Sequence, residues 1–130
     1  MSALEGLRVI DAATLFAGPT AATMMADFGA KVVKIEHPKK GDPVRGHGYS
    51  KDGHSLWWAN IGRNKETLAL DFSKPEGAQL LLDLIENTDI FIENFRPGAL
   101  DKLGFGYDDL EALNPRLIYC SEKGFLDGPY

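Results

Sequence analysis

Apolar runs and amphipathic segments alternate along the chain. Runs rich in Val, Ile, Leu and Phe, which favour strands, lie at residues 7–13, 31–36, 67–72, 89–95 and 117–120. Between them, residues 20–28 and 78–85 carry apolar side chains at helical spacing. A strand, a short helix and a second strand in succession favour a right-handed βαβ unit with parallel pairing. The pattern therefore predicts an α/β fold with a mostly parallel sheet.

Turn and capping residues predict where further helices begin. Ser73 and Glu76 have the spacing of a capping box, in which two side chains bond the backbone at the start of a helix. Asp108 and Glu111 repeat this spacing. Residues 97–103 begin with Pro-Gly and are predicted to form a short helix.

Residues 37–66 show neither a helical nor an alternating pattern. A loop of this length in a chain of 130 residues, which is one domain or part of a larger one, is usually functional or disordered. Trp57 and Trp58 favour order, because indole rings pack against neighbours. The same pair could stack a base, although a core role is the simpler interpretation.

Charge is unevenly distributed along the chain. The formal net charge is −5, which argues against nucleic-acid binding, yet residues 31–65 hold eight basic residues against three acidic ones and all three histidines. Residues 37–66 are therefore predicted to be a long basic loop. Such a segment suits a small polyanion such as a coenzyme phosphate, and an ordinary solvated loop explains it equally well.

Hydropathy and cysteine content exclude several protein classes. No apolar run is long enough to span a bilayer, and the first residues lack the pattern of a secretory signal, so the chain is expected to be cytoplasmic without membrane contact. A single cysteine, Cys120, excludes an internal disulfide and is expected to be an inert core residue.

Candidate chemistry lies where the predicted strands end, because ligands of open parallel sheets bind beyond the carboxyl ends of the strands. Turns at Gly18 and Gly98 each lead toward a predicted helix, whose free N–H groups favour an anion. Cations and an imidazole are present at three of the five strand ends. The convergence of these cations, the imidazole and the helix N–H groups at the strand ends predicts a ligand that bears phosphate. These strand ends are residues 16–19, 36–37, 70–72, 94–98 and 121–124.

Familiar catalytic and nucleotide motifs are absent. There is no Gly-x-Gly-x-x-Gly after the first strand, no P-loop, no Gly-x-Ser-x-Gly and no histidine spacing typical of a metal site. Glu36 stands where a dinucleotide fold places its ribose-binding acid, a weak signal without the glycines. Asp11 and Asp71 end apolar strands and are interpreted as capping or turn groups rather than catalytic ones.

Several motifs together resemble the class III coenzyme A transferase family, which includes formyl-CoA and carnitine CoA-transferases. They include Phe-Gly-Ala-Lys-Val-Val-Lys-Ile-Glu at 28–36, Glu-Asn-Phe-Arg-Pro-Gly at 93–98 and Leu-Asn-Pro-Arg-Leu-Ile-Tyr at 113–119. The remaining matches are residues 7–11, 17–19, 41–43, 45–46, 64–65, 70–71, 75–77, 103–104, 124–125 and 128–130. The likeness covers nearly the whole chain in the order of the family.

The resemblance implies a Rossmann-like large domain with a small domain, in subunits that interlock as a homodimer. Residues 1–130 correspond to the N-terminal part of the CoA-binding domain. Such enzymes move CoA from an acyl-CoA to a carboxylic acid through aspartyl anhydride and thioester intermediates, without a tightly bound cofactor. The nucleophilic aspartate is expected beyond Tyr130, so this chain alone is expected to be inactive and to hold no catalytic residue and no metal.

The resemblance also implies a set of CoA-binding residues. Phe16 stands where some members carry a glutamine, which suggests a different acceptor pocket, and His37 stands where many carry an arginine facing the CoA phosphates. Residues 121–126 look closer to the branch that acts on C4–C5 dicarboxyl-CoA esters. The CoA-binding set comprises Leu15, Phe16, Ala17, His37, Leu70, Asp71, Phe72, Ser73, Asn94, Phe95, Arg96, Lys102 and Lys123.

Two other functions stay open. An acyl-CoA racemase of the same superfamily would share this part of the chain. A non-catalytic module that binds CoA or a nucleotide would need only the residues present.

Overall fold

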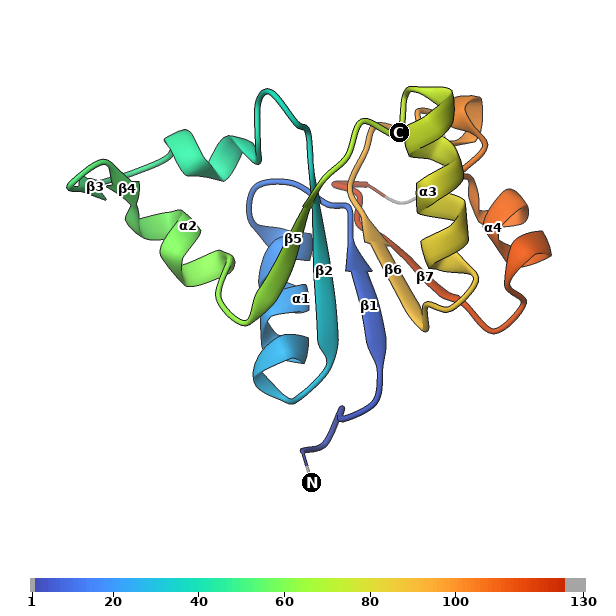
Figure 1. Ribbon diagram of the computed structural model, residues 1–130, viewed down its shortest axis with the longest axis horizontal. Coiled ribbons are helices and arrows are strands. Elements are labelled where there is room, and N and C mark those ends of the chain that lie inside the picture. Colours follow the sequence, from blue (N-terminus) through green and yellow to red (C-terminus); the bar gives the residue numbers. More distant parts are fainter. Residues whose placement is uncertain (1, 126–130) are drawn as a thin grey trace.

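Five strands form one sheet in the computed structural model, which describes residues 2–125. The strand order is β5-β2-β1-β6-β7 and every pairing is parallel (Figure 1). The order places the first strand in the middle, with the later strands added outward on both sides, as in dinucleotide-binding folds. The predicted α/β class with a mostly parallel sheet is thus confirmed. The strands are β1 (Arg8–Asp11), β2 (Lys31–Glu36), β5 (Lys65–Ala69), β6 (Ile90–Glu93) and β7 (Ile118–Ser121).

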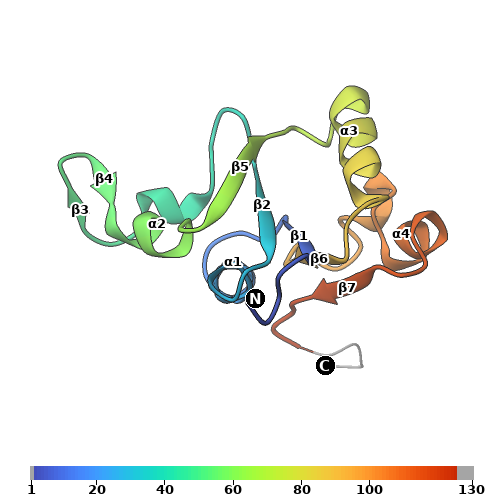
Figure 2. The same ribbon diagram turned by 60° about the horizontal axis from the view of Figure 1, so that its bottom comes forward.

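Helices cover both faces of this sheet. The helix α1 (Ala17–Asp27) lies on one face, and α3 (Pro75–Ile85) and α4 (Tyr107–Leu113) lie on the other (Figures 1 and 2). Strand β6 is buried along its whole length, because its alternate side chains enter the two cores: Phe91 packs on the α3 side and Ile92 on the α1 side. This explains why its sequence is continuously apolar rather than alternating.

The segment expected to lack regular structure contains several short elements, which corrects that expectation. A 3-10 turn (Pro43–Gly46), a hairpin of β3 (Ser50–Lys51) and β4 (His54–Ser55), and α2 (Leu56–Ile61) form an arm that projects beside β5 (Figure 1). The Ser55 hydroxyl accepts a hydrogen bond from the Trp58 N–H at 3.2 Å and so caps α2. The next strand, β5, begins at Lys65 instead of residue 67. Each element is too short to produce a periodic pattern.

The predicted capping boxes are also corrected. Lys74 precedes α3 without a side-chain cap, because the Ser73 hydroxyl donates to the Asp71 carboxylate at 2.5 Å instead. Helix α4 begins two residues earlier than the predicted box requires, and its Gly106 N–H donates to Asp109 Oδ2 at 3.2 Å. Residues 97–103 form a turn followed by one 3-10 turn (Asp101–Leu103) rather than a helix, so this segment offers no helix N-terminus to an anion.

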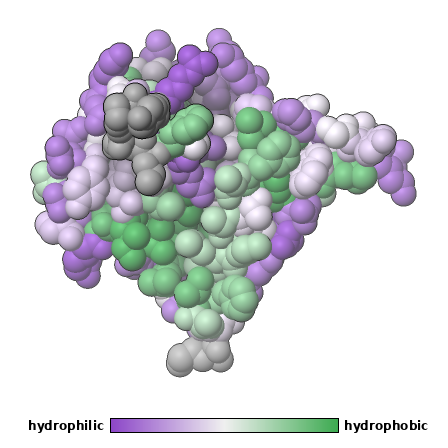
Figure 3. All heavy atoms as spheres, turned by 180° about the vertical axis from the view of Figure 1, so that it is seen from behind, coloured by the Kyte–Doolittle hydropathy of each residue, from purple (hydrophilic) through white to green (hydrophobic). Residues whose placement is uncertain are grey.

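Apolar side chains gather on the face covered by α1 (Figure 3). Met24, Phe28 and Ile118 are among the large exposed ones. Among the helices of residues 2–125, none has the length and apolar character needed to cross a membrane. The Gly128-Pro129-Tyr130 segment, after which the nucleophile is expected, lies outside the described residues.

Candidate functional site

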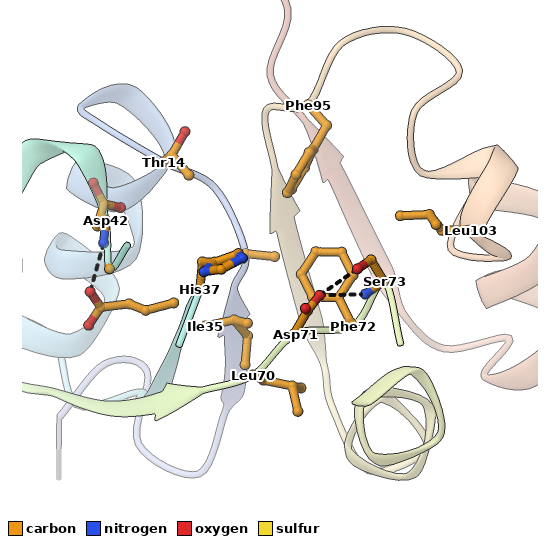
Figure 4. A pocket seen from close by; sticks show the side chains of 13 residues that line it. Thr14, Ile35, His37, Asp42, Leu70, Asp71, Phe72, Ser73, Phe95 and Leu103 are labelled. Carbon is orange, nitrogen blue, oxygen red and sulfur yellow. Dashed lines mark hydrogen bonds between the residues drawn. The ribbon is translucent and has the colours of Figure 1, made fainter. Parts of the chain in front are cut away.

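A hollow of about 280 Å³ lies at the carboxyl edge of the sheet, the edge at which the strands end (Figure 4). The segments that follow β1, β2, β5 and β6 meet there, as the topology requires. Six residues of the predicted CoA-binding set line it, namely His37, Leu70, Asp71, Phe72, Ser73 and Phe95. The other lining residues, which lie outside that set, are Ala12, Thr14, Ile35, Glu36, Gly41, Asp42 and Leu103.

Aromatic and aliphatic side chains form one wall of the hollow. The Phe72 ring lies edge-on to Phe95, with ring centroids 5.9 Å apart, and packs on Phe105 from its other side at 5.6 Å. Leu70 and Leu103 extend this wall (Figure 4). Because Phe105 is fully buried, the wall is anchored in the core and offers a firm apolar surface to a ligand.

The rim of the hollow is polar. Asp71 Oδ1 accepts bonds from the Ser73 hydroxyl and amide, and the hydroxyl bond in particular lowers the pKa of the Asp71 carboxyl. His37 is exposed, and its Nδ1 accepts the Lys39 N–H at 3.1 Å. With Nδ1 engaged, Nε2 is the ring nitrogen that can meet a ligand.

Glu36, at the end of β2, is held inside the protein. The Arg45 guanidinium donates to both of its carboxylate oxygens, at 2.7 and 2.8 Å, and the Asp42 N–H donates to Oε2 at 2.8 Å. Burial would raise the pKa of Glu36, but these bonds hold it below its ordinary value. Arg45 in turn lies 3.6 Å from the centre of the Trp58 ring, so the arm is tied to the site.

The turn between β1 and α1 carries Leu15, Phe16 and Ala17. Phe16 precedes the first residue of α1 and is 38% exposed. Its ring contacts His47 and Trp57 of the arm edge-on, with centroids 5.6 and 5.1 Å apart. These predicted residues therefore stand beside the hollow and not in its lining, which the β1–α1 connection enters through Ala12 and Thr14.

The remaining predicted residues lie apart from this first hollow. Asn94, Arg96 and Lys123 line a second one of about 280 Å³, which shares Phe95 with the first. Lys123 Nζ donates to both Glu93 carboxylate oxygens, at 2.7 and 2.9 Å, and is therefore engaged within the protein. Lys102 is exposed and lines neither hollow. The structure thus brings most of the predicted set to two hollows that share Phe95, while Leu15, Phe16, Ala17 and Lys102 line neither.

A buried network of four charged residues lies beneath the turn, and sequence analysis missed it. Lys34 Nζ lies 3.4 Å from Asp11 Oδ1 and 3.1 Å from Asp42 Oδ2, and it also donates to the Ala13 carbonyl. Lys65 Nζ donates to Asp11 Oδ2 at 2.8 Å, and burial lowers the pKa of Lys65 although Asp11 opposes the shift. Asp11 is thus neither a capping nor a turn group. The available signal was Lys34 itself, a lysine among apolar residues of a central strand.

Two further titratable groups lie on or directly after β7. Burial raises the pKa of the Glu122 carboxyl, and the nearby Asp11 and Glu93 raise it further. Burial likewise raises the pKa of Cys120, which keeps this partly buried free thiol protonated. Within residues 2–125, no three His, Cys, Asp or Glu side chains are grouped so that they could hold a metal ion.

Comparison with known proteins shows which family the sequence matches. A family model described as CoA-transferase family III matches residues 4–130. The chain is 43% identical to a succinyl-CoA–D-citramalate CoA-transferase of Chloroflexus aurantiacus and 41% identical to a formyl-CoA:oxalate CoA-transferase of a Bradyrhizobium strain. Both alignments cover 98% of this chain, but 32% and 30% of the relatives, so the chain spans about a third of their length.

Solved structures agree. A CAIB/BAIF family protein of Brucella suis is 39% identical and superposes with a TM-score of 0.91, over 99% of this chain and 35% of that protein. A hypothetical protein of Mycobacterium tuberculosis is 34% identical and gives 0.90, over 99% of this chain and 36% of that one. The sheet and the loops at its carboxyl edge therefore belong to a fold shared by longer proteins.

Proposed function

The chain belongs to CoA-transferase family III, as its sequence motifs predicted, and from this we propose that it forms the CoA-binding surface of an acyl-CoA:carboxylate CoA-transferase. The observation that carries the proposal is the hollow at the carboxyl edge, with an apolar wall on one side and an exposed imidazole on its rim. A CoA molecule needs both kinds of surface, because it joins an uncharged pantetheine arm and a flat adenine ring to several phosphates.

The hollow and the exposed basic residues outside its apolar wall suit different parts of CoA. The wall of Phe72, Phe95 and Leu103 offers apolar contact to the adenine or the pantetheine arm. His37, Arg96 and Lys102 are exposed and are proposed to meet the phosphates, since charge-assisted bonds to phosphate are strong. Lys123 is proposed to orient the Glu93–Phe95 segment, because its ammonium already binds Glu93 and the Phe95 carbonyl.

The state of Glu36 favours CoA over a dinucleotide. In dinucleotide-binding folds the acid at the end of the second strand accepts bonds from ribose hydroxyls. Here Arg45 and the Asp42 amide occupy both carboxylate oxygens of Glu36. A ribose would have to displace a bidentate guanidinium, so this Rossmann-like sheet is ill suited to NAD in spite of its strand order.

We propose the aspartyl route for the reaction, with the nucleophile supplied from outside this sequence. The aspartate carboxylate attacks the acyl-CoA carbonyl and releases CoA thiolate, leaving a mixed anhydride. The thiolate then attacks the aspartyl carbonyl, which frees the donor acid and forms an aspartyl thioester. The acceptor carboxylate then attacks the aspartyl thioester, which releases the thiolate and forms a second mixed anhydride. The thiolate attacks the acceptor's carbonyl in this anhydride, so the acceptor leaves as its acyl-CoA and the aspartate carboxylate is free again. The N-terminus of α1 at Ala17 would stabilise the negative charge that develops at the thioester.

The acceptor is proposed to be a small carboxylic acid. The relatives named above act on citramalate and on oxalate, which are both small carboxylates. Phe16 packs against His47 and Trp57, so an apolar surface borders the start of α1. We further propose that the whole enzyme works as a homodimer, on the basis of the family resemblance.

The test is a binding titration of the protein that carries this chain, by native mass spectrometry or calorimetry, with CoA and with NAD. We expect a CoA complex and no NAD complex. Arg96→Gln should weaken CoA binding about tenfold, the value of one charge-assisted contact. Arg116→Gln is the matched control, because Arg116 is equally exposed but precedes β7 at the opposite edge. Binding of NAD in preference to CoA, or equal losses in both variants, would refute the proposal.

A further inference from the structure

We propose that Asn94 and Asp42 are positioning residues that clamp the Thr14–Leu15 turn, and so fix the start of α1 relative to the hollow. The inference rests on the proposed function for its catalytic consequence. The evidence for the clamp itself is four hydrogen bonds to residues 13–15, one residue with a left-handed backbone conformation and a buried ion pair.

Asn94 holds Thr14 from the β6 side. The Thr14 N–H donates to Asn94 Oδ1 at 2.8 Å, and Asn94 Nδ2 donates to the Thr14 carbonyl at 2.8 Å. The side-chain amide thus pairs with one backbone residue as a second strand would, across 80 positions of sequence. Both ends of the amide are used on Thr14, so the Asn94 side chain serves the turn instead of reaching toward CoA.

Asp42 holds Leu15 from the β2 side. Its Oδ1 accepts the Leu15 N–H at 3.2 Å and the Val44 N–H at 2.8 Å. Its Oδ2 lies 3.1 Å from Lys34 Nζ, and both side chains are almost completely buried. Lys34 also donates to the Ala13 carbonyl. One buried cation therefore holds both Asp42 and Ala13, the residue that precedes the turn. The segment 13–15 is therefore bonded from two strands at once.

The backbone of Leu15 explains why such a clamp is needed. Its φ is +67°, in the left-handed region, which costs a residue with a side chain about 1–2 kcal/mol. A non-glycine residue stays in this region only when its surroundings over-determine it. The conformation turns the chain sharply from β1 into α1, and it sets where Phe16 and Ala17 begin the helix. Released from its partners, the turn would relax and move this helix start.

The experiment compares Asn94→Ala and Asn94→Asp with Asn87→Ala in the protein that carries this chain. Asn87 is an exposed asparagine at the opposite edge of the sheet and is the matched control. Asn94→Asp keeps the acceptor for the Thr14 N–H but loses the donor to the Thr14 carbonyl. Amide hydrogen exchange of the peptide that contains residues 13–17 reports on the clamp without any need for activity. Steady-state kinetics with succinyl-CoA and a small carboxylate report on kcat and KM.

We expect amide exchange in this peptide to speed up at least about tenfold in Asn94→Ala, less in Asn94→Asp and not at all in Asn87→Ala. We expect kcat to fall about 10- to 100-fold in Asn94→Ala while KM for the acyl-CoA changes little, because a small displacement of reacting groups costs that much. Unchanged exchange in Asn94→Ala would overturn the clamp. A loss confined to KM would make Asn94 a direct CoA ligand, and faster exchange with unchanged kcat would leave it a structural role only.

The two proposals fail in different ways. If the wild-type protein transfers no CoA, the proposed function fails, while the exchange measurement still decides whether the clamp exists. If Asn94→Ala does not fold, Asn94→Asp carries the same exchange comparison with a smaller expected change.

Discussion

The two edges of the sheet differ in how deeply the charged groups that hold their connections are buried. At the carboxyl edge, side chains link segments that are far apart in sequence: Asn94 bonds Thr14, Asp42 bonds Leu15, and Arg45 bonds Glu36. The amino edge, at which the strands begin, also has a hollow, and at about 380 Å³ it is larger than the one at the carboxyl edge. Side chains also link distant segments at the amino edge, but there the bond from the Arg8 N–H to Asp89 Oδ2 and the Arg63–Asp27 pair are exposed.

The comparison shows that size alone does not identify a site. The larger hollow is bordered by exposed charges of both signs, including Arg8, Lys31, Glu66 and Asp83, which solvent can screen. The smaller one adjoins a network in which charged groups are buried and bonded to backbone. Burial of charge is costly unless every group is paired, so its presence marks a place where position is tightly constrained.

The largest expected difference is between substitutions of two lysines of β2, of which one is buried and the other exposed. Lys34→Met removes a fully buried cation from between Asp11 and Asp42, and we expect a loss of about 3–5 kcal/mol of unfolding free energy. Lys31→Met, at the exposed start of β2, should change it by no more than about 0.5 kcal/mol. Chemical denaturation measures both. Similar small losses in the two variants would mean that the network does not stabilise the carboxyl edge.

The next effect contrasts two glycines. A Cβ at Gly77, in the first turn of α3, would lie 2.2 Å from the Asp71 carbonyl oxygen, so Gly77→Ala should cost about 2 kcal/mol by overpacking. Gly6 precedes β1 with φ +94° and open space around it, so Gly6→Ala should cost about 1 kcal/mol from backbone strain alone. Thermal unfolding measures both. Helix propensity by itself predicts the opposite sign at Gly77, and a gain there would disprove the close contact.

Two ion pairs give the third effect. Arg45 and Arg63 have equally exposed side chains, at 43%, but their partners differ: Glu36 is 8% exposed and Asp27 is 33% exposed. Arg45→Ala should lower the free energy of unfolding by about 2 kcal/mol, because it leaves the buried Glu36 carboxylate without its guanidinium partner. Arg63→Ala, whose partner ends α1 at the amino edge, should cost about 0.5 kcal/mol. Equal losses in urea denaturation would show that burial of the carboxylate does not matter.

The smallest effect is a pH dependence carried by Glu36. Burial would raise its pKa, but the bonds from Arg45 and the Asp42 amide lower it below the ordinary 4.5. As pH falls, the unfolded chain takes up this proton first, so the stability due to ionised Glu36 is complete above pH 4.5 and is lost through the lowered pKa. The stability difference between wild type and Glu36→Gln should therefore shrink from about pH 6 to about pH 3. A constant difference would contradict the pKa shift.

Much of the fold could be predicted from the sequence, because four of the five strands lie in short runs rich in apolar residues, which favour buried strands. Each of the five predicted runs overlaps a strand of the sheet, and the parallel pairing follows from the helices between them. The arm at 43–61 could not be predicted. Its elements are two to six residues long, and its order depends on Arg45 stacking on Trp58 and on Ser55 capping α2.

The candidate site was predicted in part. His37, Leu70, Asp71, Phe72, Ser73 and Phe95 do meet at one hollow, because parallel strands end at a common edge. Asn94 and Lys123 could not be distinguished from free polar groups, since their partners Thr14 and Glu93 lie 80 and 30 residues away. The sequence shows that a residue is polar and does not show which distant group uses it.

The sequence by itself determined the fold class, the edge at which chemistry gathers and the family, because periodicity, strand ends and motif order are local properties of the chain. Only the tertiary structure decided which charged residues are exposed to a ligand and which are paired inside. Lys34, Asp11 and Asp42 become a buried network, and His37 stays exposed, through the parallel register that places Asp11 beside Lys34. Pairing of charge depends on distances between separate strands, and packing alone sets those distances.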